Sequence, residues 1–507
     1  MTDLNRRDFM RWMAAVAGTS ALPAFGQNLH AQDAGRPPNI VLVTADDMGL
    51  QLGCYGDAQA HTPNLDRFAQ ENVLFRNAYI TTPGCSPSRA SMLTGLYPHQ
   101  NGQIGLSHLG FEMKEGIETI PARLKEAGYR TGLLGKLHVK PHRAFGFDFK
   151  YGGFDYVVDG EKTQFIDEPV DVVDHQWNEQ EKTIKHMQIP ERVGELTGRF
   201  VDASDDQPFF LMVNFPDPHP PYYHQIAGVP EQPKKAAEMQ RMDFIPPDEP
   251  FHANAAAAYY NGVTRLDACF EQVLQQLRDR GVYDNTIVIF ISDHGPNFGH
   301  RGKGTLYEAG LGVPMLARFP GQQGPVEIEQ AVSALDLMPT ALDAAGVSSS
   351  SDLPGQSLLR LFNDRWRPWE NVVGEYNYHV PEMLKPMRSI NDGRYKLIHN
   401  LFAPMYREIL AEWGIEKVDD LADDAPWQRH NYLSYAQRSE FELYDLKEDP
   451  HEFENLADDP DHAETRQRML ALLRSWQQRT GDILRDERRM REMREEGRKL
   501  LSEVFDR

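Results

Sequence analysis

The sequence predicts an α/β fold in which a mainly parallel sheet carries helices on both faces, with a smaller C-terminal α+β domain. Continuous apolar runs rich in β-branched residues at 39–47, 285–295 and 313–321 indicate buried strands. Helical segments alternate with these strands, which favours a parallel sheet with helices on both sides. The chain has 507 residues, of which 40% are hydrophobic and 25% charged, as is typical of a soluble globular protein.

The first 35 residues predict an export signal. Arg6 and Arg7 precede a short apolar run of small residues, and residues 9–32 contain no acidic side chain. This pattern is typical of a twin-arginine signal, and the apolar run is too short to span a bilayer securely. We therefore expect a bacterial-type protein exported to the periplasm or the extracellular space.

Residues 36–368 are expected to form the catalytic domain. The helix at 62–75 is expected to begin at Thr62 and Pro63, a cap residue followed by proline at the first helical position. The expected order is strand 39–47, helix 62–75, helix 85–95, helix and strand 118–139, strand and proline-rich loop 208–222, surface excursion 225–252, helix 254–280, strand 285–295, strand 313–321 and helix 334–346. Ligands of such sheets bind beyond the carboxyl ends of the strands.

Residues 369–507 are expected to form the C-terminal domain. The composition changes at 348–355, after which GRYKLIHNL (393–401) and FELYDLKEDP (441–450) indicate antiparallel strands. Residues 461–507 predict one or two charged helices. The charged face at 486–501 indicates a solvated helix, and a homodimer contact is the alternative.

Charge and cysteine content exclude several classes of protein. The formal net charge of −22 argues against nucleic acid and anionic membranes as partners. Outside the N-terminus, no apolar run has transmembrane length. The odd number of cysteines excludes a disulfide framework, and Cys54 and Cys269 are most simply buried thiols. Cys85 lies among Pro and Gly residues at the start of a helix and needs another explanation.

Acidic residues follow two of the predicted strands. Asp46 and Asp47 end one strand, and Asp293 and His294 end another. A turn or capping role would explain either pair alone. Three carboxylates that converge at one sheet edge must share a cation or repel one another, and hard oxygen ligands favour Ca²⁺ or Mg²⁺.

Basic residues also lie at or just after the ends of predicted strands, or at the starts of predicted helices. Each of them alone would be a surface residue, but together they predict a basic pocket in an acidic protein; they are Arg89, Lys136, His138, His219 and Lys303. With a metal and a helix N-terminus near Ser88, they predict a site for a tetrahedral oxyanion, such as a sulfate or phosphate ester. Cys85 could act there as a thiolate nucleophile. A thiolate is a poor ligand for a hard cation, however, and a hydroxyl-bearing group would suit the site better.

The segment CSPSRASMLTG (85–95) resembles the signature of the type I sulfatases, in which the cysteine of Cys-x-Pro-Ser-Arg is oxidised to Cα-formylglycine. The stretches ADDMG, TPNLDRFA, GKLH, PHPP, SDHG and GKGTLYEAG also match in family order, across essentially the whole mature chain. The resemblance implies an alkaline-phosphatase-like fold, hydrolysis of sulfuric esters, one Ca²⁺ ion and a formylglycine-generating enzyme as a partner.

The resemblance also implies roles for single residues. The aldehyde at position 85 would hydrate to a geminal diol, one oxygen of which attacks sulfur. Arg89 would hold the formylglycine, Lys136 and Lys303 would bind sulfate oxygens, and His219 or Lys303 would protonate the leaving group. His138 would take the proton of the second diol oxygen, which expels sulfate and restores the aldehyde. The implied metal ligands are Asp46, Asp47, Cys85, Asp293 and His294.

The implied substrate is a sulfated saccharide. Residues 99–106, 381–390, 396–401 and 441–457 resemble the heparan N-sulfatase (N-sulfoglucosamine sulfohydrolase) branch of the family, which cleaves an N–S bond. That branch usually has Asn and Arg at the positions of His294 and Lys303. In this respect the chain resembles the O-sulfatases instead. We therefore predict a glycan sulfatase of N-sulfoglucosamine type, and a carbohydrate O-sulfatase, for example on a 6-O-sulfated hexosamine, is the alternative.

The second domain is expected to contribute to sugar binding through Tyr378, His379 and Arg388. The alternative is that these side chains hold the domain interface. Two other classes stay open at this point: a phosphonate or phosphodiester hydrolase of the same superfamily, and a non-enzymatic exported metal protein in which Cys85 is unmodified.

Overall fold

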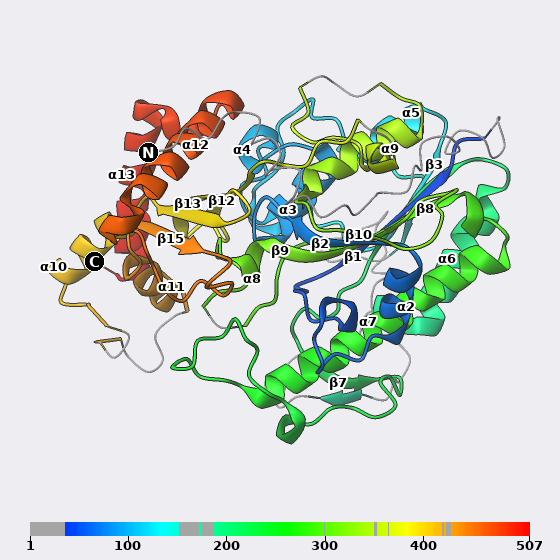
Figure 1. Ribbon diagram of the computed structural model, residues 1–507, viewed down its shortest axis with the longest axis horizontal. Coiled ribbons are helices and arrows are strands. Elements are labelled where there is room, and N and C mark those ends of the chain that lie inside the picture. Colours follow the sequence, from blue (N-terminus) through cyan, green and yellow to red (C-terminus); the bar gives the residue numbers. More distant parts are fainter. Residues whose placement is uncertain are drawn as a thin grey trace, which may run out of the picture.

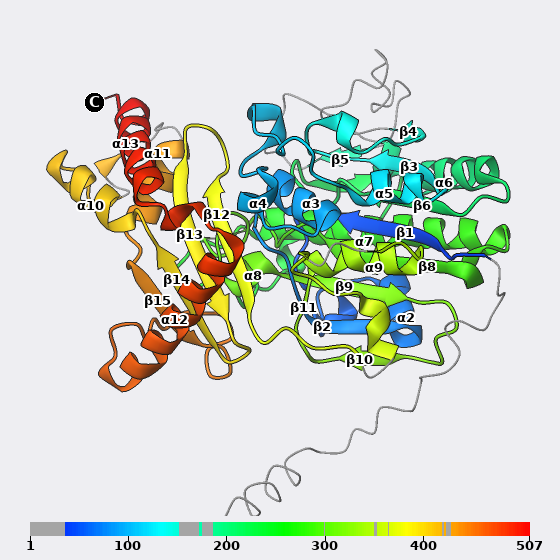
Figure 2. The ribbon, with the colours of Figure 1, turned by 90° about the horizontal axis from the view of Figure 1, so that it is seen from above.

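The structure is a computed structural model that describes residues 36–151, 172–174, 186–298, 300–348, 352–362, 365–417, 420–421 and 427–506. The expected export signal lies outside these residues. Two bodies are visible, one built on a large sheet and the other on a smaller C-terminal sheet (Figures 1 and 2). Within the described residues, no helix is both long and apolar enough to cross a membrane.

The large sheet is mixed and mostly parallel, as expected. In the described part of the chain it has nine strands in the order β10-β2-β9-β8-β1-β6-β3-β4, with β11 paired to β2. The strands are β1 (Asn39–Ala45), β2 (Val73–Tyr79), β3 (Arg130–Gly135), β4 (Phe149–Tyr151), β6 (Phe209–Asn214), β8 (Thr286–Ser292), β9 (Gly312–Arg318), β10 (Val326–Ile328) and β11 (Val332–Ser333). Strand β1 pairs in parallel with β6 and β8, whereas β9 runs antiparallel to both of its neighbours.

Helices cover both faces of this sheet. Successive residues of a strand point to opposite faces, so each face carries apolar side chains that a layer of helices buries. On one face, Val41 and Val43 of β1 pack in a core with α2 (Pro63–Glu71), α6 (Pro190–Ser204) and α7 (Ala253–Asp279). On the other face, Ile40 and Leu42 pack with α3 (Cys85–Thr94), α5 (Ile120–Glu126) and α9 (Leu337–Ala344). Figure 1 shows α7 and α2 on one side of the sheet and α5 and α9 on the other.

Two expected segments differ from the structure. The helix expected over 62–75 ends at Glu71, and β2 starts at Val73. The side-chain amide of Asn72 donates to the Phe68 carbonyl at the helix end, and the apolar run that follows is buried in the sheet. At the start of the excursion expected at 225–252, β7 (Tyr223–Ile226) pairs with β5 (Val172–Asp174).

The second sheet is antiparallel. It contains β12 (Val372–Tyr378), β13 (Leu384–Asn391), β14 (Tyr395–Asn400) and β15 (Phe441–Asp445). The antiparallel strands expected at 393–401 and 441–450 are confirmed as β14 and β15, which pair with each other. Its helices are α10 (Ala403–Glu412), α11 (Trp427–Ala436), α12 (Ala463–Thr480) and α13 (Glu487–Val504). The charged helix α13 is not solvated all round, since Met493, Gly497 and Leu501 are buried.

Strand β12 and the loop that follows it join the two bodies. The backbone N–H of Glu375 donates to the Thr81 carbonyl (2.8 Å), and the N–H of Leu106 donates to the His379 carbonyl (3.2 Å). Apolar side chains from both bodies form one continuous core. Strand β12 is therefore held against the edge of the large sheet that carries the site described below.

Gly135 allows a test of how tightly the end of β3 packs. It has φ +83°, and a Cβ there would lie 2.0 Å from the Asn214 carbonyl oxygen. Gly128 has φ +88° with no atom within 4 Å of such a Cβ, so Gly128→Ala isolates the cost of the left-handed conformation, about 1–2 kcal/mol. We expect Gly135→Ala to lower the free energy of unfolding by about 3 kcal/mol or more. Urea denaturation measures both variants, and equal losses would contradict this packing.

Candidate active site

The carboxyl ends of three strands bring the predicted polar residues together. Asp46 and Asp47 follow β1, Asp293 and His294 follow β8, and Lys136 follows β3. Since β1 pairs in parallel with β8, their ends lie side by side, and the N–H of Asp47 donates to Asp293 Oδ1 (3.1 Å). All five side chains are buried. The structure therefore brings these five predicted residues together at one edge of the sheet.

The donor atoms fit a hard divalent cation. Two overlapping groups each place their ligand atoms within 4.8 Å of one another: Asp46, Asp47, Cys85 and His219, and Asp46, Cys85, Asp293 and His294. Within the described residues, Asp46 Oδ1 is buried and has no hydrogen-bond partner. Clustered carboxylate oxygens, one of them without a donor, are the ligand chemistry that Ca²⁺ and Mg²⁺ prefer.

Each carboxylate of the cluster also has a cationic partner. The pairs are Lys136 Nζ with Asp46 Oδ2 (2.5 Å), Lys303 Nζ with Asp47 Oδ1 (2.7 Å), and Arg89 Nε with Asp293 Oδ2 (3.0 Å). Each of the three carboxyl groups thus has one cationic partner, so a divalent cation would add positive charge to the site. Added positive charge favours the binding of an anionic ester.

The Asp46 carboxylate and the two ammonium groups of these pairs are ionised, whereas burial raises the pKa of Asp293 to about 7 despite the charges of His294 and Arg89. Burial alone would raise the pKa of Asp46, but the charge of Lys136, with those of His219 and Arg89, holds it well below its usual range. Burial alone would lower the pKa of Lys303, but the Asp47 carboxylate raises it well above its usual value. The two ammonium groups are therefore charged at neutral pH and can bind anionic oxygens.

Cys85 is the first residue of α3, as expected, and only 2% of it is exposed. Its Sγ lies 3.3 Å from His294 Nε2. Burial would raise the pKa of the thiol, but the charges of Lys136, Lys303 and His294 hold it well below its usual range. Burial likewise opposes the charge on His294, but Asp293 and the other anions raise its pKa to about 9. The position stabilises an anionic atom at residue 85.

The Arg89 guanidinium is buried and forms hydrogen bonds with protein groups at the ends of several strands. Besides Asp293, its guanidinium donates to Thr44 Oγ1 (3.2 Å), Asn214 Oδ1 (3.2 Å) and the Lys136 carbonyl (3.3 Å). Together these contacts fix the start of α3 to the ends of four strands, β1, β3, β6 and β8. Sequence reasoning missed Thr44 and Asn214, whose only signal was their place near the ends of apolar strands.

Of the two other predicted histidines, His219 belongs to the cluster, and His138 lies two residues after Lys136 in the chain. His138 is buried with φ +56°, and its Nε2 lies 2.8 Å from Nδ1 of the exposed His108, which sequence reasoning missed. The His219 ring is held through Nδ1 by the Pro220 carbonyl. Burial lowers the pKa of His219, and the Asp47 and Asp46 carboxylates oppose that shift.

The residues predicted in the second domain divide into two groups. Burial and the positive charge of Lys303 lower the pKa of His379 to about 3, which places its imidazole within electrostatic reach of the site. Arg388 does not reach the site: it is fully buried and its guanidinium donates to both carboxylate oxygens of Asp482 (2.9 Å each). Tyr378 donates to Glu496 (2.7 Å). Arg388 and Tyr378 therefore hold the second domain together, and the expectation that they reach the sugar is wrong.

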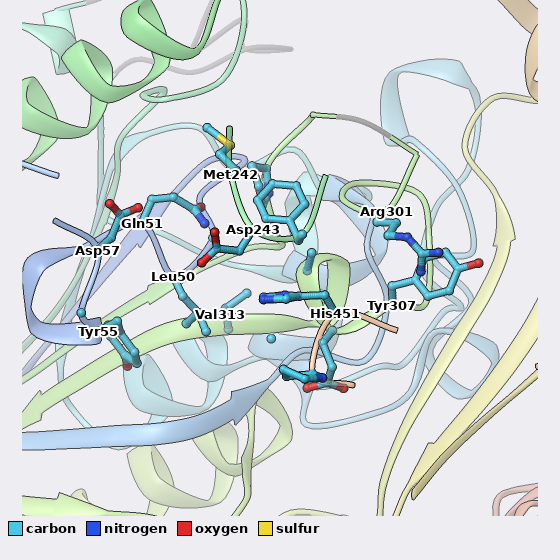
Figure 3. A pocket seen from close by; sticks show the side chains of 18 of the residues that line it. Leu50, Gln51, Tyr55, Asp57, Met242, Asp243, Arg301, Tyr307, Val313 and His451 are labelled. Carbon is cyan, nitrogen blue, oxygen red and sulfur yellow. The ribbon is translucent and has the colours of Figure 1, made fainter. Parts of the chain in front are cut away.

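A separate cavity of about 650 Å³ lies beside β2 and β9. Figure 3 shows Asp243, Arg301 and His451 around it. None of the residues of the carboxylate cluster lines this cavity. Despite its size, this cavity is therefore not the candidate active site.

Comparison with known proteins identifies the family. The sulfatase family model matches residues 38–347, and the model "N-sulphoglucosamine sulphohydrolase, C-terminal" matches residues 296–415. Human (Homo sapiens) N-sulphoglucosamine sulphohydrolase is 33% identical over 486 residues, covering 88% of this chain and 91% of the relative. An ulvan-active sulfatase of Formosa agariphila is 30% identical over 465 residues, covering 88% and 81%. The chain belongs to the sulfatase family and is a hydrolase of sulfuric esters or sulfamates.

Solved structures support the fold. A structure determined in complex with its substrate, D-glucosamine-2-N,6-O-disulfate, superposes with a TM-score of 0.61 at 21% identity. The match covers 88% of this chain and 99% of that chain. At this identity the likeness shows that the two proteins share a fold.

Metal binding gives the first test of the carboxylate cluster. Calcium should raise the Tm of chelator-treated protein by about 2–4 °C, because a ligand present at 100 times its Kd stabilises the folded state by about 2.7 kcal/mol. Asp293→Asn should remove this rise. Asp267→Asn is the matched control, since Asp267 is equally buried but accepts hydrogen bonds from the N–H groups of Asn64 and Leu65. A calcium-dependent rise that persists in Asp293→Asn would contradict the assigned site.

Proposed function

We propose that the protein removes sulfate from a sulfated glycan and that its substrate is an N-sulfoglucosamine residue. The observation that carries the proposal is the position of Cys85, at the start of α3, among three carboxylate–cation pairs. The match of residues 296–415 to the C-terminal part of N-sulphoglucosamine sulphohydrolase supports the choice of sugar.

The proposal includes two groups that the chain must acquire. Cys85 is converted to Cα-formylglycine by a formylglycine-generating enzyme, and the hydrated aldehyde supplies a hydroxyl nucleophile in place of the thiol. One Ca²⁺ ion, when bound, supplies positive charge that polarises the sulfate and favours the ionised nucleophile. The residues that would hold it are Asp46, Asp47, residue 85, Asp293 and His294.

The remaining steps belong to side chains of this chain. Lys136 and Lys303 bind the anionic oxygens of the substrate sulfate, and their ammonium groups stabilise the charge on those oxygens as the S–N bond breaks. His219 or Lys303 gives a proton to the departing nitrogen, so that it leaves as an amine. His138 then takes the proton of the second hydroxyl at residue 85, which releases sulfate and restores the aldehyde. Arg89 keeps Asp293 and the start of α3 in place.

A carbohydrate O-sulfatase is the second candidate. It is favoured by His294 and Lys303, which stand where the N-sulfatase branch usually has Asn and Arg, and by the similarity to an ulvan-active sulfatase. The same side chains would act in both reactions, with an alcohol in place of the amine as leaving group. The bond that is cleaved therefore has to be found by measurement.

Sulfate release from defined sugars makes this test. The kcat/KM for N-sulfoglucosamine should exceed that for N-acetylglucosamine 6-sulfate by about tenfold or more, which corresponds to about 1.4 kcal/mol of transition-state stabilisation. Cys85→Ser should abolish turnover of both sugars, because a serine cannot expel sulfate as a diol does. Cys54→Ser is the matched control, since Cys54 lies outside the carboxylate cluster, and should keep full activity. Preference for the 6-sulfate would establish the O-sulfatase instead.

His379 tests whether the second domain contacts the sugar. His379→Ala should raise KM for the saccharide several-fold while leaving KM for a small aryl sulfate nearly unchanged, because only the sugar would reach His379. His399→Ala is the control, since His399 stacks on Phe441 of the second sheet (4.5 Å between ring centroids). An equal loss on both substrates in His379→Ala would assign the residue to the domain interface.

We further infer the cellular setting from the N-terminal sequence. The twin-arginine pattern of residues 1–35 directs the folded enzyme to the periplasm or the extracellular space, where residues 36–368 act as the catalytic domain and residues 369–507 complete the sugar site.

A further inference from the structure

The exposed His108 contacts the buried His138, the residue assigned above to take the proton of the second hydroxyl. His108 Nδ1 lies 2.8 Å from His138 Nε2, and the ring centroids are 5.1 Å apart with 23° between the ring planes. Because the centroids are so much farther apart than the two nitrogens, the nitrogens must lie on the line between the rings. The imidazoles therefore meet edge to edge, which is the geometry of an N–H···N hydrogen bond.

The loop that carries His108 is attached to the start of α3. The N–H of the preceding residue, Ser107, donates to Oγ of Ser86 (3.0 Å), which follows Cys85 in the helix. Both serines are buried. The backbone of His108 is thus anchored one residue away from a direct contact with the first turn of α3.

The segment that carries His138 is attached to the same helix. The carbonyl of Lys136, two residues earlier, accepts a hydrogen bond from the Arg89 guanidinium (3.3 Å). The φ of His138 is +56°, a left-handed conformation that residues with a Cβ rarely adopt, so the surrounding contacts must hold it. The attachments of both segments to α3 therefore hold the histidine pair near the helix start that carries residue 85.

The direction of the hydrogen bond between the two rings decides whether His138 can act as a base. A neutral imidazole carries its proton on one nitrogen and accepts a proton only at the other. If His138 Nε2–H donates to His108 Nδ1, the His138 Nδ1 is the basic nitrogen. If His108 donates instead, the proton of neutral His138 lies on Nδ1 and its Nε2 lone pair is already occupied. The first arrangement also stabilises the imidazolium, because Nε2–H continues to donate to His108.

We propose that His108 is a positioning residue for His138: its Nδ1 accepts a hydrogen bond from His138 Nε2–H, which leaves His138 Nδ1 to take the proton of the second hydroxyl at residue 85. His138 Nδ1 gains this proton as a new N–H bond. The electrons of the broken O–H bond form the aldehyde C=O bond, and sulfate departs with the electrons of its C–O bond. The inference rests on the proposed function, since it explains how one step of that reaction is prepared.

Nitrogen NMR tests the hydrogen bond without turnover. The full-length protein is labelled with ¹⁵N in its histidine rings, and loss of signals in His138→Gln assigns those of His138. At a pH at which this ring is neutral, its proton should lie on Nε2, and His108→Leu should remove this preference. A proton on Nδ1 of neutral His138, or an unchanged preference in His108→Leu, would overturn the proposal.

An isosteric pair of variants separates hydrogen bonding from packing. Asn places its Oδ1 where His108 has Nδ1 and can accept the hydrogen bond, whereas Leu has a similar shape and no acceptor. On the sulfated sugar that the enzyme turns over best, His108→Leu should lower kcat about tenfold or more with KM nearly unchanged. His108→Asn should recover most of this loss. His61→Leu, which replaces an exposed histidine just before α2, is the control and should keep full activity.

The other outcomes assign His108 a different role. A raised KM with unchanged kcat in His108→Leu would assign it to the saccharide, and equal losses in His108→Leu and His108→Asn would assign it to the packing of its loop; either result overturns the proposal. Turnover by the unsubstituted enzyme is measured separately. Its absence would refute the proposed function, whereas the position of the proton on His138, which needs no turnover, decides the role of His108.

Discussion

The burial of three carboxylates at one edge of the large sheet is the constraint on which the site depends. Asp46, Asp47 and Asp293 lie at the ends of two neighbouring parallel strands, where water cannot solvate them and where they would repel one another. Each is balanced by a cation that comes from another part of the chain: the end of β3, the second turn of α3, or the loop after β8. This requirement joins separate segments into one rigid anion-binding pocket.

The same ion pairs position the proposed nucleophile. Cys85 and Arg89 are one turn apart on α3, so the contacts of Arg89 with Asp293, Thr44 and Asn214 also fix residue 85 against the carboxylate cluster. The second domain reaches this pocket because the edge strand β12 forms hydrogen bonds with the catalytic domain. Sugar recognition and bond cleavage would thus use different domains, which allows the saccharide specificity to change while the sulfate chemistry stays the same.

Local sequence patterns predicted much of this arrangement. Strands β1 and β8 are mostly apolar and buried throughout, and the acids that follow them identified the sheet edge; Cys85 was found through a compact motif. Patterns could not show that β9 runs antiparallel, because an apolar run carries no direction. Nor could they separate His379, which lies near the site, from Arg388, whose partner Asp482 is 94 positions away in the chain.

The most direct test of the account is the mass of the peptide that contains Cys85, measured in active protein purified from its native host. The account predicts an aldehyde in place of the thiol at residue 85, together with hydrolysis of N-sulfated glucosamine. An unmodified thiol in protein that still hydrolyses sulfate esters or sulfamates would contradict it, and the buried cluster would then have to act around a cysteine thiolate.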